Sequence, residues 1–215
     1  MMDALLKQGF VIASVDYALK KSYPQNIQDV VCSIQYLRAK ASALHIDPDR
    51  IGIWGDSAGG HLAALAGLAN QTGGFDSSAF PQISSKVQAV IDLYGPTIMA
   101  TQVFGTEQAN PIAWISKTPD SDPPFLIVHG ALDGTVPVSD SQALYNALIA
   151  KGQPARLQTV EGADHGFFPN DSTINPSDAQ ITATMIDFFI QHLKPSQDQP
   201  TPRSFESSSG VPRAP

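Results

Sequence analysis

Short runs of apolar residues alternate along the chain with segments in which apolar residues recur every three or four positions. The first run covers residues 10–15 and is rich in β-branched side chains, which is typical of a buried strand. In the next segment the spacing is that of one buried helix face, carried by Ile27, Val30, Val31, Ile34 and Leu37. The pattern predicts a strand followed by an amphipathic helix.

The same strand and helix pair repeats toward the C-terminus. After a turn at residues 47–49, residues 51–54 are predicted to form a strand, and residues 58–69 are small and apolar nearly all round, as expected of a central buried helix. Further strands are predicted at residues 87–94, 125–128 and 156–160, and further helices at residues 139–150 and 177–193.

Strands that alternate with helices indicate an α/β fold. Such a chain order implies right-handed crossovers and a mostly parallel sheet with helices on both faces. Sheets of this kind hold their active sites beyond the carboxyl ends of the strands. We expect residues 1–195 to form one domain, and we expect residues 196–215, which are rich in Ser and Pro, to be a disordered tail.

Composition narrows the classes of partner. The formal net charge is -7 and no Lys/Arg cluster occurs, which argues against nucleic acid and anionic membranes and favours a neutral small molecule. No apolar run is long enough to span a bilayer, and no export signal is visible at the N-terminus, so the compartment, cytoplasmic or secreted, stays open. The single cysteine, Cys32, can form neither an internal disulfide nor a cysteine-based metal site, and we expect no metal. The oligomeric state is not predicted.

The segment Gly55-Asp56-Ser57-Ala58-Gly59 matches the Gly-x-Ser-x-Gly pattern of a nucleophile elbow. It lies between the predicted strand 51–54 and the predicted helix 58–69, where such an elbow must lie. Glycines on either side allow a tight backbone turn that lifts the Ser57 hydroxyl above the sheet, and the helix N-terminus favours a developing negative charge. The alternative is that Ser57 only caps the helix.

A serine hydroxyl needs a base to remove its proton, and His165 is the best candidate. It lies in a Gly-flanked loop, residues 161–167, directly after the predicted strand 156–160. The other histidines have structural interpretations: His61 would pack one turn past Ser57, and His129 would shape the loop that carries the acid. His45 precedes a turn, and His192 ends the last helix.

The acid that orients the imidazole should lie between the serine and the histidine in the sequence. Asp133 does, just beyond the predicted strand 125–128, although an Asp before Gly134 is also common in turns. Asp92, within the predicted strand 87–94, is the rival. Asp164 is adjacent to His165 and therefore poorly placed to meet its ring.

Two motifs carry a resemblance to a known family. Residues 46–51 (Ile-Asp-Pro-Asp-Arg-Ile) and 55–63 (Gly-Asp-Ser-Ala-Gly-Gly-His-Leu-Ala) resemble the hormone-sensitive-lipase-like esterases and, more closely, the bacterial feruloyl and acetyl esterase group. Further similar segments are residues 15–17, 123–130, 136–137 and 162–167, and the resemblance runs from about Gly9 to Leu193. It implies an α/β-hydrolase fold and a cofactor-free hydrolase that acts through an acyl-enzyme on short-chain or hydroxycinnamoyl esters.

The resemblance also implies an oxyanion hole and departures from the family pattern. The Ala58 N–H would be one donor, whereas the family's His-Gly-Gly loop and first strands would lie before Met1. Residues 10–15 would be the fourth strand and residues 51–54 the fifth. The family's third strand lies between these two, so its absence would leave a gap in the sheet and make the domain partial. Ala18 stands where the family has Arg, and Trp114 would line an acyl pocket or belong to the core.

Two other functions stay open at this point. One is a non-catalytic or weakly active fragment of such an esterase. The other is a serine peptidase of the prolyl-oligopeptidase type, because its triad has the same chain order.

Overall fold

The computed structural model describes residues 1–19, 23–69, 75–118, 120–169 and 173–194, and every structural statement below concerns these residues. The predicted tail, residues 196–215, lies outside them. The strands are β1 (Gly52–Asp56), β2 (Ala89–Leu93), β3 (Phe125–Gly130) and β4 (Ala155–Val160). The helices are α1 (Met2–Lys7), α2 (Gln25–Ala39), α3 (Ala41–Leu44), α4 (Ala58–Ala69), α5 (Ile98–Phe104), α6 (Val138–Ala150) and α7 (Asp178–Leu193), with 3-10 turns η1 (Glu107–Ala109), η2 (Pro111–Trp114) and η3 (His165–Phe167).

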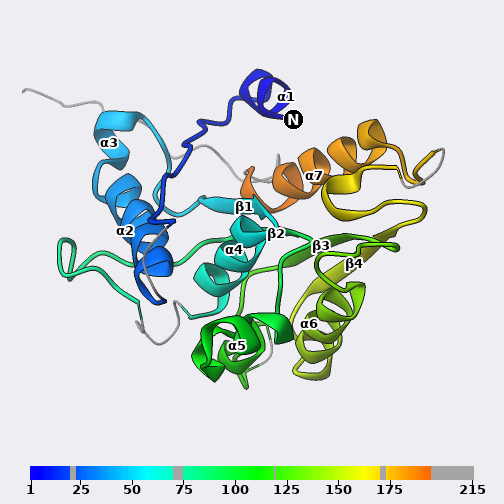
Figure 1. Cartoon of the computed structure of the whole chain (residues 1–215). Coiled ribbons are helices and arrows are strands. Elements are labelled where there is room, and N and C mark those ends of the chain that lie inside the picture. The colour runs from blue at the N-terminus through cyan, green and yellow to red at the C-terminus, as the bar shows by residue number, and fades with distance from the viewer. Residues whose placement is uncertain (20–22, 70–74, 119, 170–172, 195–215) are drawn as a thin grey trace, which may run out of the picture.

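The four strands form one sheet in the order β1-β2-β3-β4, and every neighbouring pair is parallel. Figure 1 shows α1 and α7 on one face of this sheet and α4, α5 and α6 on the other. The predicted α/β class is therefore confirmed. None of the helices in the described ranges has the length and hydrophobicity to cross a bilayer.

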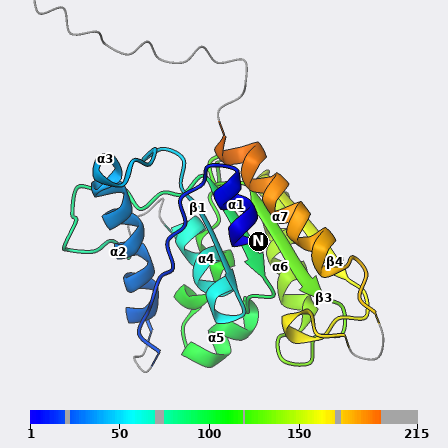
Figure 2. The same ribbon diagram turned by 90° about the horizontal axis from the view of Figure 1, so that it is seen from above.

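Two hydrophobic cores lie on opposite faces of the sheet. The first joins β3 to α2, α4 and α6, and its fully buried members include Ile27, Leu65 and Leu144. The second joins the other face of the sheet to α1 and α7 through residues such as Leu5 and Phe189. In Figure 2, which looks from above, α7 and α1 lie along the side of the sheet opposite to α4. The sheet is thus the middle layer of three.

The strand predicted at residues 10–15 is wrong. These residues form no strand, because a strand exists only where its backbone pairs with a neighbour. The Phe10 N–H donates to the Leu5 carbonyl at the end of α1, at an N···O distance of 3.1 Å. From residue 11 to residue 17, no backbone hydrogen bond joins the segment to another described backbone group. The hydrophobic pattern is that of a strand, but the ladder is missing.

Candidate active site

The turn from β1 into α4 places Ser57 at the carboxyl end of the sheet. Its backbone has a φ of +52°, a left-handed conformation that a serine rarely adopts. Its N–H donates to the Leu93 carbonyl of β2, and its own carbonyl accepts from His61 N–H in the first turn of α4. The strained turn is held from both sides and presents the hydroxyl above the sheet.

Close approach of the backbone explains one of the two elbow glycines. A Cβ on Gly55 would lie 2.3 Å from the Gly59 carbonyl oxygen, so any side chain at residue 55 would push the turn apart. A Cβ on Gly59 would meet no atom within 4 Å. The prediction that the turn needs glycine on both sides is therefore corrected. Gly55 must lack a side chain because the Gly59 backbone lies against it, whereas Gly59 has room for a side chain.

Three side chains from separate loops meet at this turn. The His165 Nε2 lies 2.9 Å from Ser57 Oγ, and the His165 Nδ1 lies 2.8 Å from Asp133 Oδ2. Asp133 follows β3, and His165 lies in η3, beyond β4. The Asp133 side chain is fully buried, while the His165 ring keeps 24% of its surface exposed. The structure thus brings all three predicted residues into one hydrogen-bonded row.

The Asp133 carboxylate is held on both oxygens. Its Oδ1 accepts from the backbone N–H groups of Thr135 (2.9 Å) and Val136 (2.8 Å), which leaves Oδ2 facing the imidazole. His129 Nε2 lies 3.3 Å from the same Oδ2 and 2.9 Å from the Val136 carbonyl. His129 Nδ1 contacts Ser141 Oγ at 2.6 Å. His129 therefore lies against the loop that carries Asp133, as the sequence indicated.

Burial lowers the pKa of the His129 imidazole below its usual value, despite the carbonyl of Val136 and the charge of Asp133, which raise it. A neutral imidazole carries one N–H. Because Nε2 faces two acceptors, the proton resides there, and Nδ1 accepts from the Ser141 hydroxyl. His129 thus donates toward the loop of Asp133 without adding a second positive charge beside His165.

Sequence reasoning missed Tyr94. Its ring meets the His165 ring edge to face, with centroids 4.8 Å apart, and its backbone has a φ of +44°. Burial, together with the nearby carboxylates of Asp56 and Asp133, raises the pKa of the Tyr94 hydroxyl to about 12, so that the hydroxyl keeps its proton. The sequence did offer one indication that Tyr94 lies near the site: it stands directly before Gly95 at the end of a buried strand.

The rival acids occupy other positions. Asp164 Oδ1 accepts from the backbone N–H groups of Gly134 (2.9 Å) and His165 (2.7 Å), and these bonds lower the pKa of its carboxyl. Asp92 is buried in β2, where its Oδ1 accepts from Gly95 N–H at 2.9 Å. Neither carboxylate hydrogen-bonds with the imidazole of His165 in the described structure.

Two other candidate residues pack against neighbouring elements: His61 is buried and Trp114 is half-buried. The His61 ring stacks on Phe104 with centroids 5.8 Å apart, its Nε2 lies 2.6 Å from the Ala109 carbonyl, and its burial lowers its pKa. The Trp114 ring contacts Phe75 at a centroid distance of 5.2 Å and packs against the first core. Both belong to the framework behind the elbow.

Asp92 gives a prediction about stability. Burial is the main cause that raises its pKa to about 7, with the Asp140 carboxylate adding to it, and Oδ2 has no hydrogen-bond partner. The folded protein therefore keeps a proton that the unfolded chain loses near pH 4. The proton bound to Asp92 therefore stabilises the folded state relative to the unfolded chain. This stabilisation is fully present below about pH 4 and is lost as the pH rises to about 7, which lowers the free energy of unfolding by on the order of 4 kcal/mol.

We expect Asp92→Asn to remove this part of the pH dependence, because asparagine is neutral throughout. Urea unfolding at pH 4.5 and pH 8 measures it: the variant should gain stability over the wild type at pH 8 only. Asp187→Asn, at an exposed position of α7, is the matched control and should leave the profile unchanged. A variant that is less stable than the wild type at pH 8 would contradict the prediction.

The chain is similar in sequence to a known protein family and to several esterases. Residues 1–105 match the family model described as BD-FAE. The chain is 28% identical to Esterase LipC of Mycobacterium tuberculosis (strain ATCC 25618 / H37Rv) over 93% of this chain and 54% of that protein. It is 26% identical to the probable carboxylic ester hydrolase LipM of the same organism, over 92% of this chain and 50% of that protein. The chain thus spans about half the length of these curated relatives.

Solved structures are similar to this chain in overall fold. A truncated form of a carbohydrate esterase from gut microbiota superposes with a TM-score of 0.74 at 30% identity, over 87% of this chain and 75% of that one. Esterase 2 of Thermogutta terrifontis, phosphorylated by paraoxon, superposes with a TM-score of 0.70 at 27% identity, over 84% of this chain and 71% of that one.

Proposed function

The chain belongs to the α/β-hydrolase esterases of the hormone-sensitive-lipase-like group, and from this premise we propose that it hydrolyses carboxylic esters through an acyl-enzyme on Ser57. The observation that carries the proposal is the row of hydrogen bonds from Ser57 Oγ through the His165 ring to Asp133. A serine, a histidine and an aspartate in this order are the working parts of acyl transfer.

In the proposed reaction, Ser57 Oγ attacks the ester carbonyl carbon while His165 Nε2 takes the hydroxyl proton. The carbonyl oxygen becomes an oxyanion, and His165 then returns the proton to the departing alcohol, which leaves an acyl group on Ser57. A water molecule, activated by His165 in the same way, releases the acid and restores the hydroxyl. Asp133 holds the ring with Nε2 toward Ser57 throughout.

The Ala58 N–H is the proposed donor to the oxyanion. It lies at the first position of α4, directly after Ser57, and donates to no other described residue. The first N–H groups of a helix have no partner within the helix, and the helix dipole favours negative charge at this end. Loss of one oxyanion donor typically costs about 10² to 10³ in turnover, so this group matters for the rate.

For the substrate we propose short-chain acyl or hydroxycinnamoyl esters of neutral alcohols. The similar proteins support ester chemistry, since they include Esterase LipC and a carbohydrate esterase. The net charge of -7 disfavours anionic substrates. We propose no cofactor, because each proton and nucleophile in these steps comes from Ser57, His165 or water.

A fluorophosphonate probe tests the nucleophile, since it reacts covalently with activated serines. The full chain should be labelled at Ser57, and Ser57→Ala should not be labelled at all. Ser42→Ala, at an exposed serine of α3, is the matched control and should label like the wild type. Labelling that persists in Ser57→Ala, or no labelling of wild-type protein that unfolds in one cooperative thermal transition, would refute the mechanism.

The substrate class has a separate readout. Initial rates on p-nitrophenyl butyrate and on methyl ferulate should exceed the background rate, and both should vanish with Ser57→Ala. A labelled protein that hydrolyses neither ester would leave the nucleophile assigned and reject the substrate class.

A further inference from the structure

The ring of Tyr94 packs beside the imidazole of His165. The two rings meet edge to face with their centroids 4.8 Å apart, which is within the range of favourable aromatic pairs. Tyr94 is buried, with 7% of its surface exposed, whereas the His165 side chain keeps 24% of its surface exposed. The partly open ring of the base is therefore backed by a buried ring.

The position of Tyr94 is fixed by its backbone and by another ring. Its N–H donates to the Val128 carbonyl of β3 at 2.8 Å. The Phe167 ring meets it edge to face at a centroid distance of 4.8 Å and also packs against the second core. The preceding residue, Leu93, accepts the hydrogen bond from Ser57 N–H. One turn at the end of β2 thus supports the nucleophile through its backbone and the base through a side chain.

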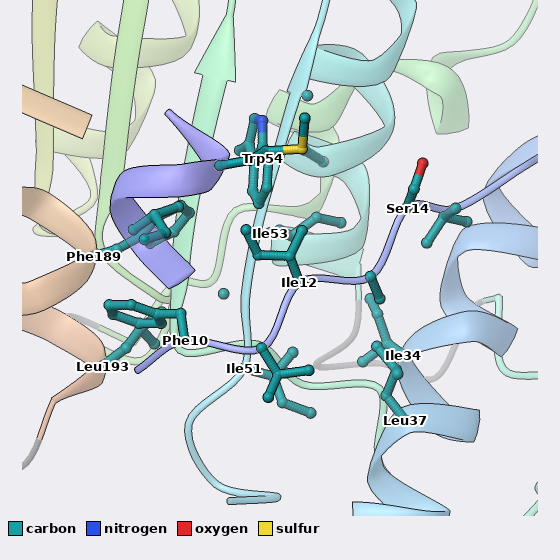
Figure 3. A pocket seen from close by; sticks show the side chains of 18 of the residues that line it. Phe10, Ile12, Ser14, Ile34, Leu37, Ile51, Ile53, Trp54, Phe189 and Leu193 are labelled. Atoms are coloured by element: carbon teal, nitrogen blue, oxygen red, sulfur yellow. The ribbon is translucent and has the colours of Figure 1, made fainter. Parts of the chain in front are cut away.

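This contact lies away from the cavity beside β1. Figure 3 shows Phe10, Ile12 and Trp54 among the side chains that line that cavity. Neither Tyr94 nor His165 is one of the described residues that line it. The packing of the two rings is therefore a property of the turn after β2 and of the loop after β4.

Two hydrogen bonds hold the His165 ring while the Ser57 hydroxyl is free. Nδ1 lies 2.8 Å from Asp133 Oδ2, and Nε2 lies 2.9 Å from Ser57 Oγ. A neutral imidazole has one N–H, which faces the carboxylate, so Nε2 accepts from the hydroxyl. In an acyl-enzyme, Ser57 Oγ is an ester oxygen without a proton, and neither atom can donate to the other. Of the two bonds, only the one to Asp133 then remains.

The second half of the reaction needs the ring in the same place. Water attacks the acyl carbon while His165 Nε2 takes its proton. The bond between the acyl carbon and Ser57 Oγ then breaks, Oγ receives that proton, and the acid leaves. A ring held by one hydrogen bond at Nδ1 can swing about that atom unless a neighbour blocks the movement. A misplacement of about 1 Å can cost about 10² in rate.

We propose that Tyr94 is a positioning residue that keeps the His165 ring in place while Ser57 carries the acyl group. Its ring takes over the support that the Ser57 hydroxyl gives in the free enzyme. Tyr94 therefore matters more for deacylation than for acylation. The inference rests on the acyl-enzyme of the proposed function and adds a residue that keeps its second step fast.

Stopped-flow release of p-nitrophenol from p-nitrophenyl butyrate by the full chain separates the two steps, because the burst reports acylation and the following phase reports deacylation. In Tyr94→Ala the rate constant of deacylation should fall about 10²-fold and that of acylation less than about fivefold. As a result kcat and KM should fall together, with little change in kcat/KM. Mass spectrometry during turnover should show butyrate bound to Ser57 accumulating in the variant.

Further variants separate the ring of Tyr94 from its hydroxyl and from general stability. Tyr94→Phe keeps the ring and should deacylate like the wild type. Tyr94→Leu keeps apolar bulk without a flat ring, should lie between the other two, and replaces Tyr94→Ala if that variant does not unfold cooperatively. The matched control is Tyr23→Ala, which removes a half-buried ring that contacts Phe75 and Phe104 in the first core. It should lower the midpoint of thermal unfolding and leave both rate constants unchanged.

The inference alone is overturned if the wild type forms the acyl-enzyme and Tyr94→Ala slows both steps equally or slows neither. It is also overturned if Tyr94→Phe deacylates as slowly as Tyr94→Ala, or if Tyr23→Ala gives the same slow deacylation. A wild-type protein with neither a burst nor a fluorophosphonate label would overturn the proposed function as well, so the two failures are distinct.

Discussion

The single variants Ser57→Ala and His165→Ala are each expected to lower kcat for ester hydrolysis roughly 10⁶-fold, and the double variant is expected to lower it no further. The reason is that the attack needs both the hydroxyl and the base that removes its proton, and the 2.9 Å contact between them makes one unit of the two. Initial rates on p-nitrophenyl butyrate, with protein high enough to detect the residual activity, measure the effect.

The matched control is His45→Asn. His45 is exposed at the end of α3 with a φ of +53°, a conformation that asparagine tolerates, so its replacement should leave kcat unchanged. Losses that multiply in the double variant would mean that Ser57 and His165 act independently, which contradicts the proposed mechanism.

The second large effect is expected for Asp133→Asn, which should lower kcat by about 10⁴. Asparagine can keep its carbonyl oxygen on the amides of Thr135 and Val136, which places its NH₂ group toward His165 Nδ1. The ring must then accept at Nδ1 and carry its proton on Nε2, where it can no longer take a proton from Ser57. The fold should stay intact, so thermal unfolding of the variant should resemble that of the wild type.

Asp164→Asn is the control for this prediction, because it is the other carboxylate beside His165. Its amide oxygen can still accept from Gly134 N–H and His165 N–H, so the effect on kcat should be small compared with that of Asp133→Asn. If kcat falls as far in Asp164→Asn as in Asp133→Asn, the assignment of the acid role to Asp133 alone is wrong.

The sequence predicted the parts of the site that depend on local pattern and chain order. The Ser57 turn follows from a short motif between a strand and a helix, and the positions of Asp133 and His165 follow from the two strands that precede them. What the sequence left open was the choice among three carboxylates. The bond of Asp164 to Gly134 N–H joins two loops 30 residues apart, and no local pattern contains it, whereas the bond of Asp92 to Gly95 N–H lies within the turn after β2.

Features that depend on distant parts of the chain were missed or wrong. Residues 10–15 have the composition of a strand, but a strand forms only if a partner edge is present, and composition does not report that. The irregular stretch before β3 contains α5 and two 3-10 turns, whose short apolar runs have no clear period. Tyr94 lies against His165 only because the left-handed turn after β2 directs it there.

The bonds of Asp164 have a mechanical consequence. One carboxylate oxygen holds the amide beside Asp133 and the amide of His165, and the Leu132 N–H donates to the Ala163 carbonyl at 2.9 Å. These hydrogen bonds join the loops that carry the acid and the base, so the two loops should move together. Ser57 lies in the separate turn between β1 and α4, so we expect the hydrogen bond between Ser57 Oγ and His165 Nε2 to be the first of the row to lengthen.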